Sequence, residues 1–252
     1  MNKSQQPKRI FVSSGPRNIS TALMYSFAQR SDTVVVDEPL YGHYLHTTDA
    51  DTYHPGAAET LATRENDWQK VVDDILTDAP LSENSNKSVI FYKNITNHLR
   101  NMEWDFLGSV TNVILTRDPR EMLPSFAKNV PTMTLRDTGY PEHLELLTFA
   151  RERGQEPPVL DGREVLKNPG VVLAKLCEQI GIPFDEAMLS WPAGARPEDG
   201  TWAPYWYSSV HQSNGFQPYR PKNEPFPAYL EPLLDECLPL YEEITKLAIR
   251  AR

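Results

Sequence analysis

Five short apolar runs alternate with longer amphipathic stretches along the 252-residue chain. Runs of this length that are rich in β-branched residues are typical of strands buried on both faces of a parallel sheet. Their alternation with helical patterns predicts one α/β domain, with a central parallel sheet flanked by helices. The expected strands are Ile10–Val12, Thr33–Val36, Ser88–Tyr92, Asn112–Thr116 and a run within Pro158–Leu166.

Between the strands, apolar residues recur with the spacing of surface helices. One helix is expected directly after the first strand and its turn. Two aromatic segments, residues 41–56 and 191–220, lack a helical period, and we interpret them as long loops that line a pocket. The other expected helices are Leu61–Asp78, Glu121–Lys128, Glu142–Arg153, Gly170–Ile180 and Phe226–Arg252.

The turn after the first strand carries the first candidate chemistry. Glycine and proline at positions 15–16 end the strand, and Asn18 or Ser20 is expected to cap the next helix. Backbone N–H groups and the positive end of the helix dipole then converge on one point, which suits a phosphate or sulfate. Arg17 adds a full positive charge there, and Ser20 and Thr21 add hydroxyl groups.

This turn is not a Walker A motif, because it lacks the second glycine and the lysine of G-x-x-x-x-G-K-[ST]. A P-loop kinase acting on a small molecule would need that lysine and Mg²⁺, and the chain also lacks a clear Walker B aspartate. The kinase is kept as a rival function. The plain structural alternative is an ordinary βα turn with an exposed arginine.

Charged residues also follow the second and third strands. Ligands of parallel sheets bind beyond the carboxyl ends of the strands, so Glu38 in Asp37–Pro39 is expected near the oxyanion turn. It is equally open that Glu38 caps a loop or pairs with Arg17. Lys93 and then His98 follow the third strand. Their alternatives are a surface charge and a solvent-facing residue at a helix start.

The fourth strand runs directly into Arg117-Asp118-Pro119-Arg120 and a helix. Asp118 can cap this helix, and Pro119 suits its first turn. Arg117 and Ser125 stand eight residues apart, a spacing at which the strand end and the second helical turn can bracket one phosphate. The alternative is a β–α junction with a capping aspartate and solvent-facing arginines.

SSGPRNISTAL and VILTRDPREMLPSFAKN resemble two elements of the PAPS-dependent sulfotransferases, PAPS being 3′-phosphoadenosine 5′-phosphosulfate. The first resembles the loop that holds the 5′-phosphosulfate, although Arg17 and Ile19 stand where many members have lysine and glycine. The second resembles the element that holds the 3′-phosphate. The resemblance covers nearly the whole chain and implies a P-loop-like sulfotransferase fold. It implies donor binding by Gly15, Pro16, Arg17, Asn18, Ile19, Ser20, Thr21, Arg117 and Ser125.

The resemblance also implies catalytic roles. A glutamate followed by proline after the second strand resembles bacterial and carbohydrate sulfotransferases, which makes Glu38 the first candidate for the general base. Lys93 is expected to face the transferred group together with Arg17. His98 and His43 stay open as alternative bases, although His98 lies further from Lys93 than the two-residue offset of the cytosolic aryl and steroid enzymes.

A late segment resembles the loop that closes on the adenosine bisphosphate in this family. It comprises Ser213, Asn214, Gly215 and Phe216, but it lacks the R-K-G-x-x-G-x-W-K form of the cytosolic enzymes. Arg220 and Lys222 can replace the missing basic residues. Flat aromatic side chains in residues 191–220 would suit an adenine ring. The alternative is a plain surface loop.

Bulk composition narrows the partners. The formal net charge of −9 argues against non-specific binding to nucleic acid or anionic membranes. Nor does any apolar run approach the roughly 20 residues that a membrane span needs. The first nine residues do not resemble a signal peptide, so a cytoplasmic location is expected, with residues 1–8 flexible. Cys177 and Cys237 are expected as buried thiols, and the spacing of His43, His46 and His54 matches no common metal site.

The expected function is transfer of a sulfuryl group from PAPS to a hydroxyl or amine of a small-molecule acceptor. The family implies in-line displacement, which leaves PAP and needs no metal. Besides the kinase, a catalytically inactive nucleotide-binding relative stays open. The sequence identifies neither the acceptor nor the oligomeric state, so a homodimer also stays open.

Overall fold

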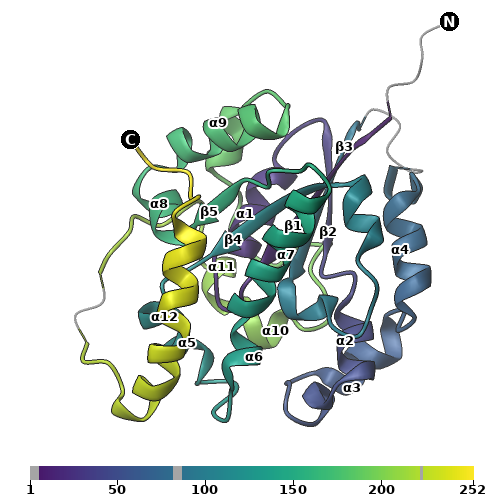
Figure 1. Ribbon diagram of the computed structural model, residues 1–252. Coiled ribbons are helices and arrows are strands. Elements are labelled where there is room, and N and C mark those ends of the chain that lie inside the picture. Colours follow the sequence, from purple (N-terminus) through teal and green to yellow (C-terminus); the bar gives the residue numbers. More distant parts are fainter. Residues whose placement is uncertain (1–5, 82–86, 222–223) are drawn as a thin grey trace, which may run out of the picture.

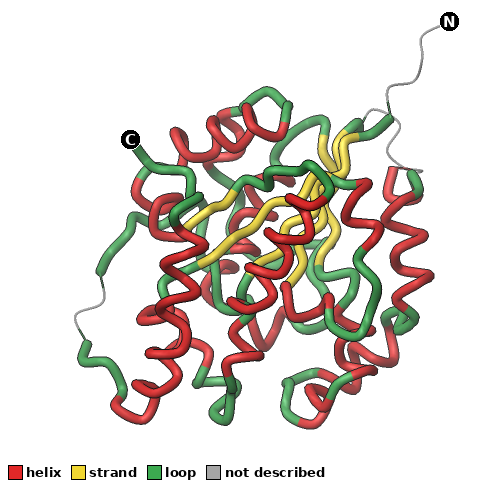
Figure 2. The backbone as a smooth tube through the Cα atoms, viewed as in Figure 1, coloured by secondary structure: helices red, strands yellow, loops and turns green. Residues whose placement is uncertain are grey.

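A computed structural model describes residues 6–81, 87–221 and 224–252. Its centre is a five-stranded sheet in the order β2-β3-β1-β4-β5, and each pair of neighbouring strands is parallel (Figure 1). Helices lie on both sides of the strands (Figure 2), so the predicted α/β fold is confirmed. The strands are β1 (Lys8–Ser14), β2 (Thr33–Asp37), β3 (Val89–Ile95), β4 (Thr111–Thr116) and β5 (Val159–Asp161).

The strand order decides which chain segments meet at the carboxyl edge. Strand β3 pairs with both β1 and β2, so the first two strands are not neighbours although one helix joins them. Strand β3 also continues past its predicted end at Tyr92, which places Lys93 inside the strand, opposite Asp37 in the register. The second and third strand ends therefore meet directly, beside the turn that follows β1.

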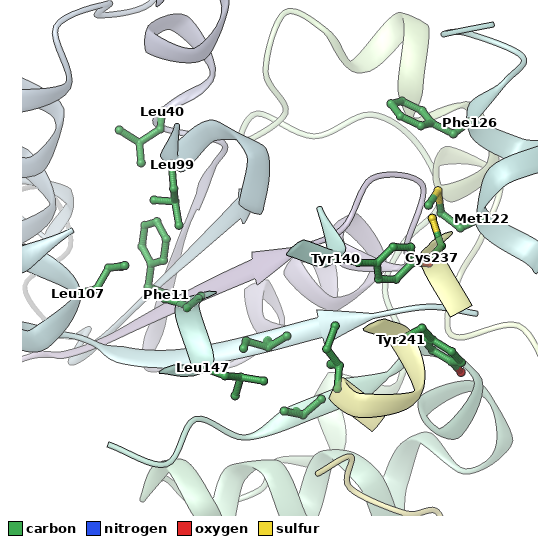
Figure 3. Close-up of a cluster of buried hydrophobic side chains, with 14 of the residues drawn as sticks. Phe11, Leu40, Leu99, Leu107, Met122, Phe126, Tyr140, Leu147, Cys237 and Tyr241 are labelled. Atoms are coloured by element: carbon green, nitrogen blue, oxygen red, sulfur yellow. The ribbon is translucent and has the colours of Figure 1, made fainter. Parts of the chain in front are cut away.

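Side chains of the central strands alternate between two apolar layers. Phe11 and Ile114 face the layer covered by α4, α5, α7 and α12, part of which is drawn in Figure 3. Ile10 and Val12 face the opposite layer, under α1 and α9. Burial on both faces explains why the strands read as continuous apolar runs in the sequence.

Two predictions about residues 41–78 are wrong. Residues 41–56 are not simply a loop, because α2 (Tyr41–Thr47) and a 3₁₀ turn (Asp49–Thr52) form there. The single helix expected over 61–78 is two helices, α3 (Ala57–Thr63) and α4 (Trp68–Leu76). The break has a local cause, since the Asp67 side chain accepts a hydrogen bond from the Gln69 amide and starts a new helix.

The C-terminal elements are also shorter than expected. Helix α12 (Glu231–Thr245) begins after a 3₁₀ turn (Ala228–Leu230), with a proline in its first turn. Residues 191–220 contain the short helices α10 (Ala203–Trp206) and α11 (Ser208–His211). Both cysteines are buried free thiols, as expected.

The remaining helices join the sheet strands or cover its faces. No helix of the described residues is long and apolar enough to cross a membrane. The α-helices are α1 (Ser20–Ala28), α5 (Pro119–Phe126), α6 (Leu135–Thr138), α7 (Tyr140–Glu152), α8 (Gly162–Lys167) and α9 (Pro169–Ile180), and the 3₁₀ turns are Ala79–Leu81, Thr96–Leu99, Asp105–Ser109 and Glu186–Leu189.

Candidate active site

A cavity of about 100 Å³ lies at the carboxyl edge of the sheet. This is where parallel sheets bind their ligands. Two sets of polar side chains line it. The loop side consists of Arg17, Asn18, Ser20 and Thr21 after β1, and the carboxylate side consists of Glu38, Lys93, His98 and Tyr207. The sequence predicted that these two sets lie near each other, but it did not predict that Tyr207 belongs to them.

On the loop side, Arg17 is held at both its backbone and its side chain. Its φ of 52° is left-handed, which is uncommon for a residue with a side chain and costs of order 1–3 kcal/mol. Its carbonyl accepts a hydrogen bond from Arg117 Nη1 at 2.8 Å. Its guanidinium donates to Ser125 Oγ at 3.2 Å and to the Trp206 carbonyl at 3.1 Å. These contacts offset the cost of the conformation.

The first turn of α1 faces the cavity without a side-chain cap. The residue that precedes the helix is Ile19, and no side chain caps it, so the prediction that Asn18 or Ser20 does so is wrong. Asn18 instead accepts from the Ile19 amide at 2.9 Å and donates to the Leu115 carbonyl at 3.0 Å, which ties the turn to β4. The first amides of a helix need partners, and a bound anion can supply them.

Gly15 begins this turn, and the space around it would admit a Cβ at ordinary contact distances. The Gly15 amide donates to the Leu115 carbonyl at 3.1 Å. A Cβ at this position would lie 3.4 Å from the Thr138 carbonyl oxygen and 3.7 Å from His143 Cε1. Pro16, Ser20 and the other loop residues that follow then reach the cavity wall.

Two arginines from different strand ends lie together, as the sequence predicted. Burial and the charge of Arg117 both lower the pKa of Arg17. One carboxylate, Glu121, faces Arg117 at 3.2 Å. Asp118 accepts from the Arg120 amide and so caps α5, with Pro119 in the first turn, as predicted. Two neighbouring guanidinium groups and uncapped helix amides make this side suited to an anion that carries several charges.

On the carboxylate side, one buried ammonium group contacts two carboxylates. Lys93 Nζ lies 3.0 Å from Asp37 Oδ1 and makes a shorter contact with Glu38 Oε1. The exposed fractions of the three side chains are 1%, 0% and 8% in that order. Glu38 also has a left-handed φ, of 40°, and its amide donates to the Lys93 carbonyl at 2.7 Å. The strained backbone thus aims this carboxylate inward.

Tyr207 closes this network from the late segment. Its hydroxyl lies 2.6 Å from Lys93 Nζ and 2.8 Å from Asp37 Oδ2, and it accepts from Trp202 Nε1 at 2.9 Å. Neither Tyr207 nor Asp37 was among the predicted site residues. A usable signal existed for Asp37, because a charged residue at the end of a buried apolar strand needs a partner.

One oxygen atom of the Glu38 carboxylate takes no hydrogen bond from Lys93. An ammonium group has three donors, and Lys93 directs them to Asp37, Glu38 Oε1 and Tyr207. Glu38 Oε2 instead faces His98 Nε2 at 3.9 Å, too far for a direct hydrogen bond. The prediction that Lys93 faces the transferred group stays a prediction, because its donors point to side chains in this structure.

The electrostatics of this side follow from its burial. Burial raises the pKa of Glu38, although Lys93 opposes the change. For Lys93, burial acts to lower the pKa, but Asp37 and Glu38 outweigh it and the pKa is raised. Burial holds the pKa of His98 well below its usual value. His98 is therefore a neutral imidazole at pH 7, whereas Glu38 beside Lys93 can act as a carboxylate.

The histidines separate into wall residues and distant ones. The ring of His98 stacks against both Tyr41 and Tyr44, with centroid distances of 4.7 and 4.9 Å. His54 lines the cavity, but His43 does not, and it hydrogen-bonds the Arg100 carbonyl at 2.8 Å. Among the described residues, no group of three or more histidine, cysteine or acidic side chains is placed to hold a metal ion.

The predicted late cofactor loop lies elsewhere. Of the described residues that line the cavity, none belongs to 213–216. Ser213 Oγ accepts from Trp191 Nε1 at 3.2 Å, Gly215 pairs with Ser190, and Phe216 packs edge-on against Trp191 at 5.0 Å. A role for Ser213, Asn214, Gly215 and Phe216 in donor binding stays a prediction. Lys222 lies outside the described residues.

The sheet topology defines a class, the parallel α/β proteins, whose ligands bind beyond the carboxyl ends of the strands. Within that class, a profile described as the sulfotransferase domain matches residues 8–248. The chain belongs to the sulfotransferase domain family.

Two solved structures share the fold. The sulfotransferase domain from the curacin biosynthetic pathway is 15% identical, with a TM-score of 0.52, and the match covers 92% of this chain and 98% of that domain. The sulfotransferase domain of the Synechococcus olefin synthase is 16% identical, with a TM-score of 0.54, and the match covers 93% and 96%. These likenesses support the fold, and the roles of individual residues need other arguments.

Curated relatives carry a different kind of name. The Arabidopsis thaliana branched-chain-amino-acid aminotransferase-like proteins 1 and 2 are 39% and 38% identical to this chain, over 94% and 90% of its length. The matches cover 41% and 40% of those proteins, so the chain spans less than half the length of either.

Proposed function

We propose that this protein transfers a sulfuryl group from PAPS to a hydroxyl or amine group of a small acceptor. The observation that carries the proposal is that Arg17, which lines the cavity, contacts both Arg117 and Ser125. Glu38 lines the same cavity. An anionic donor with phosphates at two positions needs two cationic contacts, and a group transfer from it needs a base near the acceptor.

The loop side fits such a donor. In the proposal, the uncapped amides of α1, the guanidinium of Arg17 and the hydroxyls of Ser20 and Thr21 hold the 5′-phosphosulfate. Arg117 and Ser125 hold the 3′-phosphate, which distinguishes PAPS from ATP. When bound, the donor supplies an activated sulfuryl group. Arg17 then stabilises the negative charge that grows on the bridging oxygen.

Glu38 is the better of the candidate bases. Its Oε2 is left available, and burial raises the pKa of the carboxyl, which makes it a stronger base than an exposed glutamate. His98 has a lowered pKa and is a weak base, and we assign it to orient the acceptor. His43 does not line the cavity. The acceptor proton passes to Glu38 as the acceptor oxygen or nitrogen bonds to sulfur and the bond to the 5′-phosphate breaks.

The decisive experiment combines binding with turnover. Calorimetric titration with PAP and with ATP plus Mg²⁺ separates a sulfotransferase from a P-loop kinase, and we expect PAP to bind more tightly by about 10-fold or more. A radiolabelled PAPS assay over a panel of small alcohols and amines then separates an enzyme from an inactive relative. Preference for ATP, or PAP binding without transfer to any acceptor, would count against the proposal.

A further inference from the structure

The formal charges on the carboxylate side do not cancel. Asp37 and Glu38 share the single ammonium group of Lys93, so with Glu38 ionised, as its role as the base requires, the three buried side chains sum to one negative charge. The nearby Arg100 does not correct this balance, because it pairs with Glu142 at 2.8 Å. A buried charge without a counterion is costly, and a charged ligand can supply the missing partner.

The rest of the wall is uncharged. Tyr41, Tyr44, His54 and Trp206 line the cavity, and we call them the aromatic wall. Burial raises the pKa of both tyrosines and lowers that of His54 to about 4, so all four side chains are neutral at pH 7. Aromatic side chains tolerate a cation far better than an anion.

Arg17 lines the same cavity from the loop side, and its guanidinium lies 5.8 Å from the centre of the Trp206 ring. Under the proposed function its charge is used by the donor, which itself brings several negative charges. Without the donor, Arg17 brings the formal charges of Asp37, Glu38, Lys93 and Arg17 to zero, and once the donor is bound the acceptor enters a space that is net negative. Such a field discriminates between acceptors of similar size by their charge.

The geometry also limits the size and the attachment point of the acceptor. An oxygen atom about 2.8 Å from both Glu38 Oε2 and His98 Nε2 fits between these atoms, which lie 3.9 Å apart. The cavity of about 100 Å³ corresponds to the liquid volume of roughly three water molecules. Part of it is needed for the transferred group, so the acceptor has only a few non-hydrogen atoms.

We propose that the acceptor is a small alcohol that also carries an ammonium group. This inference rests on the proposed function and specifies its substrate class. The hydroxyl lies between Glu38 and His98, and the ammonium group lies against the aromatic wall within the field of Asp37 and Glu38. Hydroxy acids of the same size are excluded, because their carboxylate meets the uncompensated negative charge.

Three compounds of nearly equal size test the charge dependence. Ethanolamine, propanol and glycolate share a primary hydroxyl group and differ in carrying a positive, zero or negative charge. Each is titrated calorimetrically into the free and the PAP-loaded protein and offered as the acceptor in the PAPS assay. We expect ethanolamine to exceed propanol by about 10-fold or more, both in affinity and in kcat/KM, and glycolate to rank last.

Two variants separate charge from packing. Asp37→Asn neutralises the excess charge, so the preference for ethanolamine over propanol should fall by about 10-fold. Tyr207→Phe removes a hydrogen-bonding hydroxyl from the same network but no charge, so the preference should stay within about 2-fold of the wild type. Asp73→Asn, on an exposed part of α4, is the matched control and should change nothing.

The outcomes distinguish the two proposals. If PAP does not bind and no acceptor is sulfated, the proposed function fails, and the binding order of the three alcohols still decides the inference. If sulfate is transferred but propanol or glycolate performs as well as ethanolamine, the inference fails and the proposed function stands. If Asp37→Asn does not fold, the ranking of ethanolamine, propanol and glycolate with the wild-type protein still distinguishes the two proposals.

Discussion

The two sides of the cavity are built in different ways. The loop side comes from residues directly after β1 and β4, two adjacent strands, and its arginines keep contact with solvent. The carboxylate side joins β2, β3 and Tyr207, which is 170 residues from Asp37 in the chain, and its charges are almost completely buried. A local turn can be altered one residue at a time. A packed network responds as a unit, because each member satisfies several others.

The two sides share one feature, a left-handed backbone at the residue that matters most. Arg17 and Glu38 have φ values of 52° and 40°, and among the described non-glycine residues Asn101 is the third such case. Strain of this kind persists where the surroundings over-determine it, and it often marks functional positions. Arg17, the proposed donor contact, and Glu38, the proposed base, can therefore be compared as two residues held in a strained backbone conformation.

The largest effect is expected on the carboxylate side, from Glu38→Gln. Glutamine can keep the contact with Lys93 but cannot take a proton, so turnover should fall by about 10²–10⁴-fold. PAP affinity, measured by calorimetry, should stay within about 2-fold. The matched variant is His98→Ala. A rate loss confined to that variant, with Glu38→Gln active, would transfer the role of base to the histidine.

On the loop side, Arg17→Ala should lower turnover by about 10²-fold, as for the loss of an oxyanion donor. PAP binding should weaken as well, because the guanidinium is proposed to contact the donor in its ground state. Arg151→Ala, on the exposed face of α7, provides a control for the loss of an arginine. Near wild-type rates in Arg17→Ala would remove this residue from the mechanism.

The same contrast explains what the sequence could and could not predict. The loop side was predictable, because Arg17, Arg117 and Ser125 follow strands whose adjacency the topology supplies. Even there, the cap was misassigned, since Asn18 turns to the Leu115 carbonyl on a strand distant in sequence. Local propensity cannot show which of several polar groups a tertiary contact will take.

The carboxylate side was only half predictable. Glu38 and Lys93 followed from their positions at strand ends, but their direct pairing depends on the insertion of β3 between β1 and β2. Three tyrosines lie in residues 191–220, and nothing in the sequence singles out one of them. In the structure Tyr205 is exposed, Tyr219 donates to Glu121 at 2.8 Å, and only Tyr207 of the three lines the cavity.

A smaller effect sharpens the description of the loop side itself. Arg117→Ala should reduce PAP affinity by between about 10- and 100-fold, because charge-assisted contacts to phosphate contribute more than neutral ones. The affinity for AMP, which lacks the 3′-phosphate, should fall much less. The ratio of the two affinities, measured by calorimetry, is the readout. An equal loss for both nucleotides would mean that Arg117 acts only by supporting the Arg17 carbonyl.

The smallest effect concerns stability, and two further histidines that are neutral at pH 7 carry it. Burial lowers the pKa of His143, beneath Gly15, and of His54, in the aromatic wall, to about 4. Between about 6.5 and 4 the unfolded chain binds more protons than the folded one, so the free energy of unfolding falls as the pH falls. For the fully buried His143 this amounts to about 2 kcal/mol between about pH 7 and pH 5.

Urea unfolding at these two pH values measures the effect, with His143→Leu as the test. The pH dependence should decrease by about 2 kcal/mol relative to the wild type. His54→Gln should change it in the same direction but less, because His54 touches the cavity and is better solvated. Glu38 acts in the opposite direction, since its raised pKa lets the folded state bind the extra proton, but it is common to all three proteins. An unchanged pH dependence in His143→Leu would show that protonation of this residue does not limit folding on the loop side.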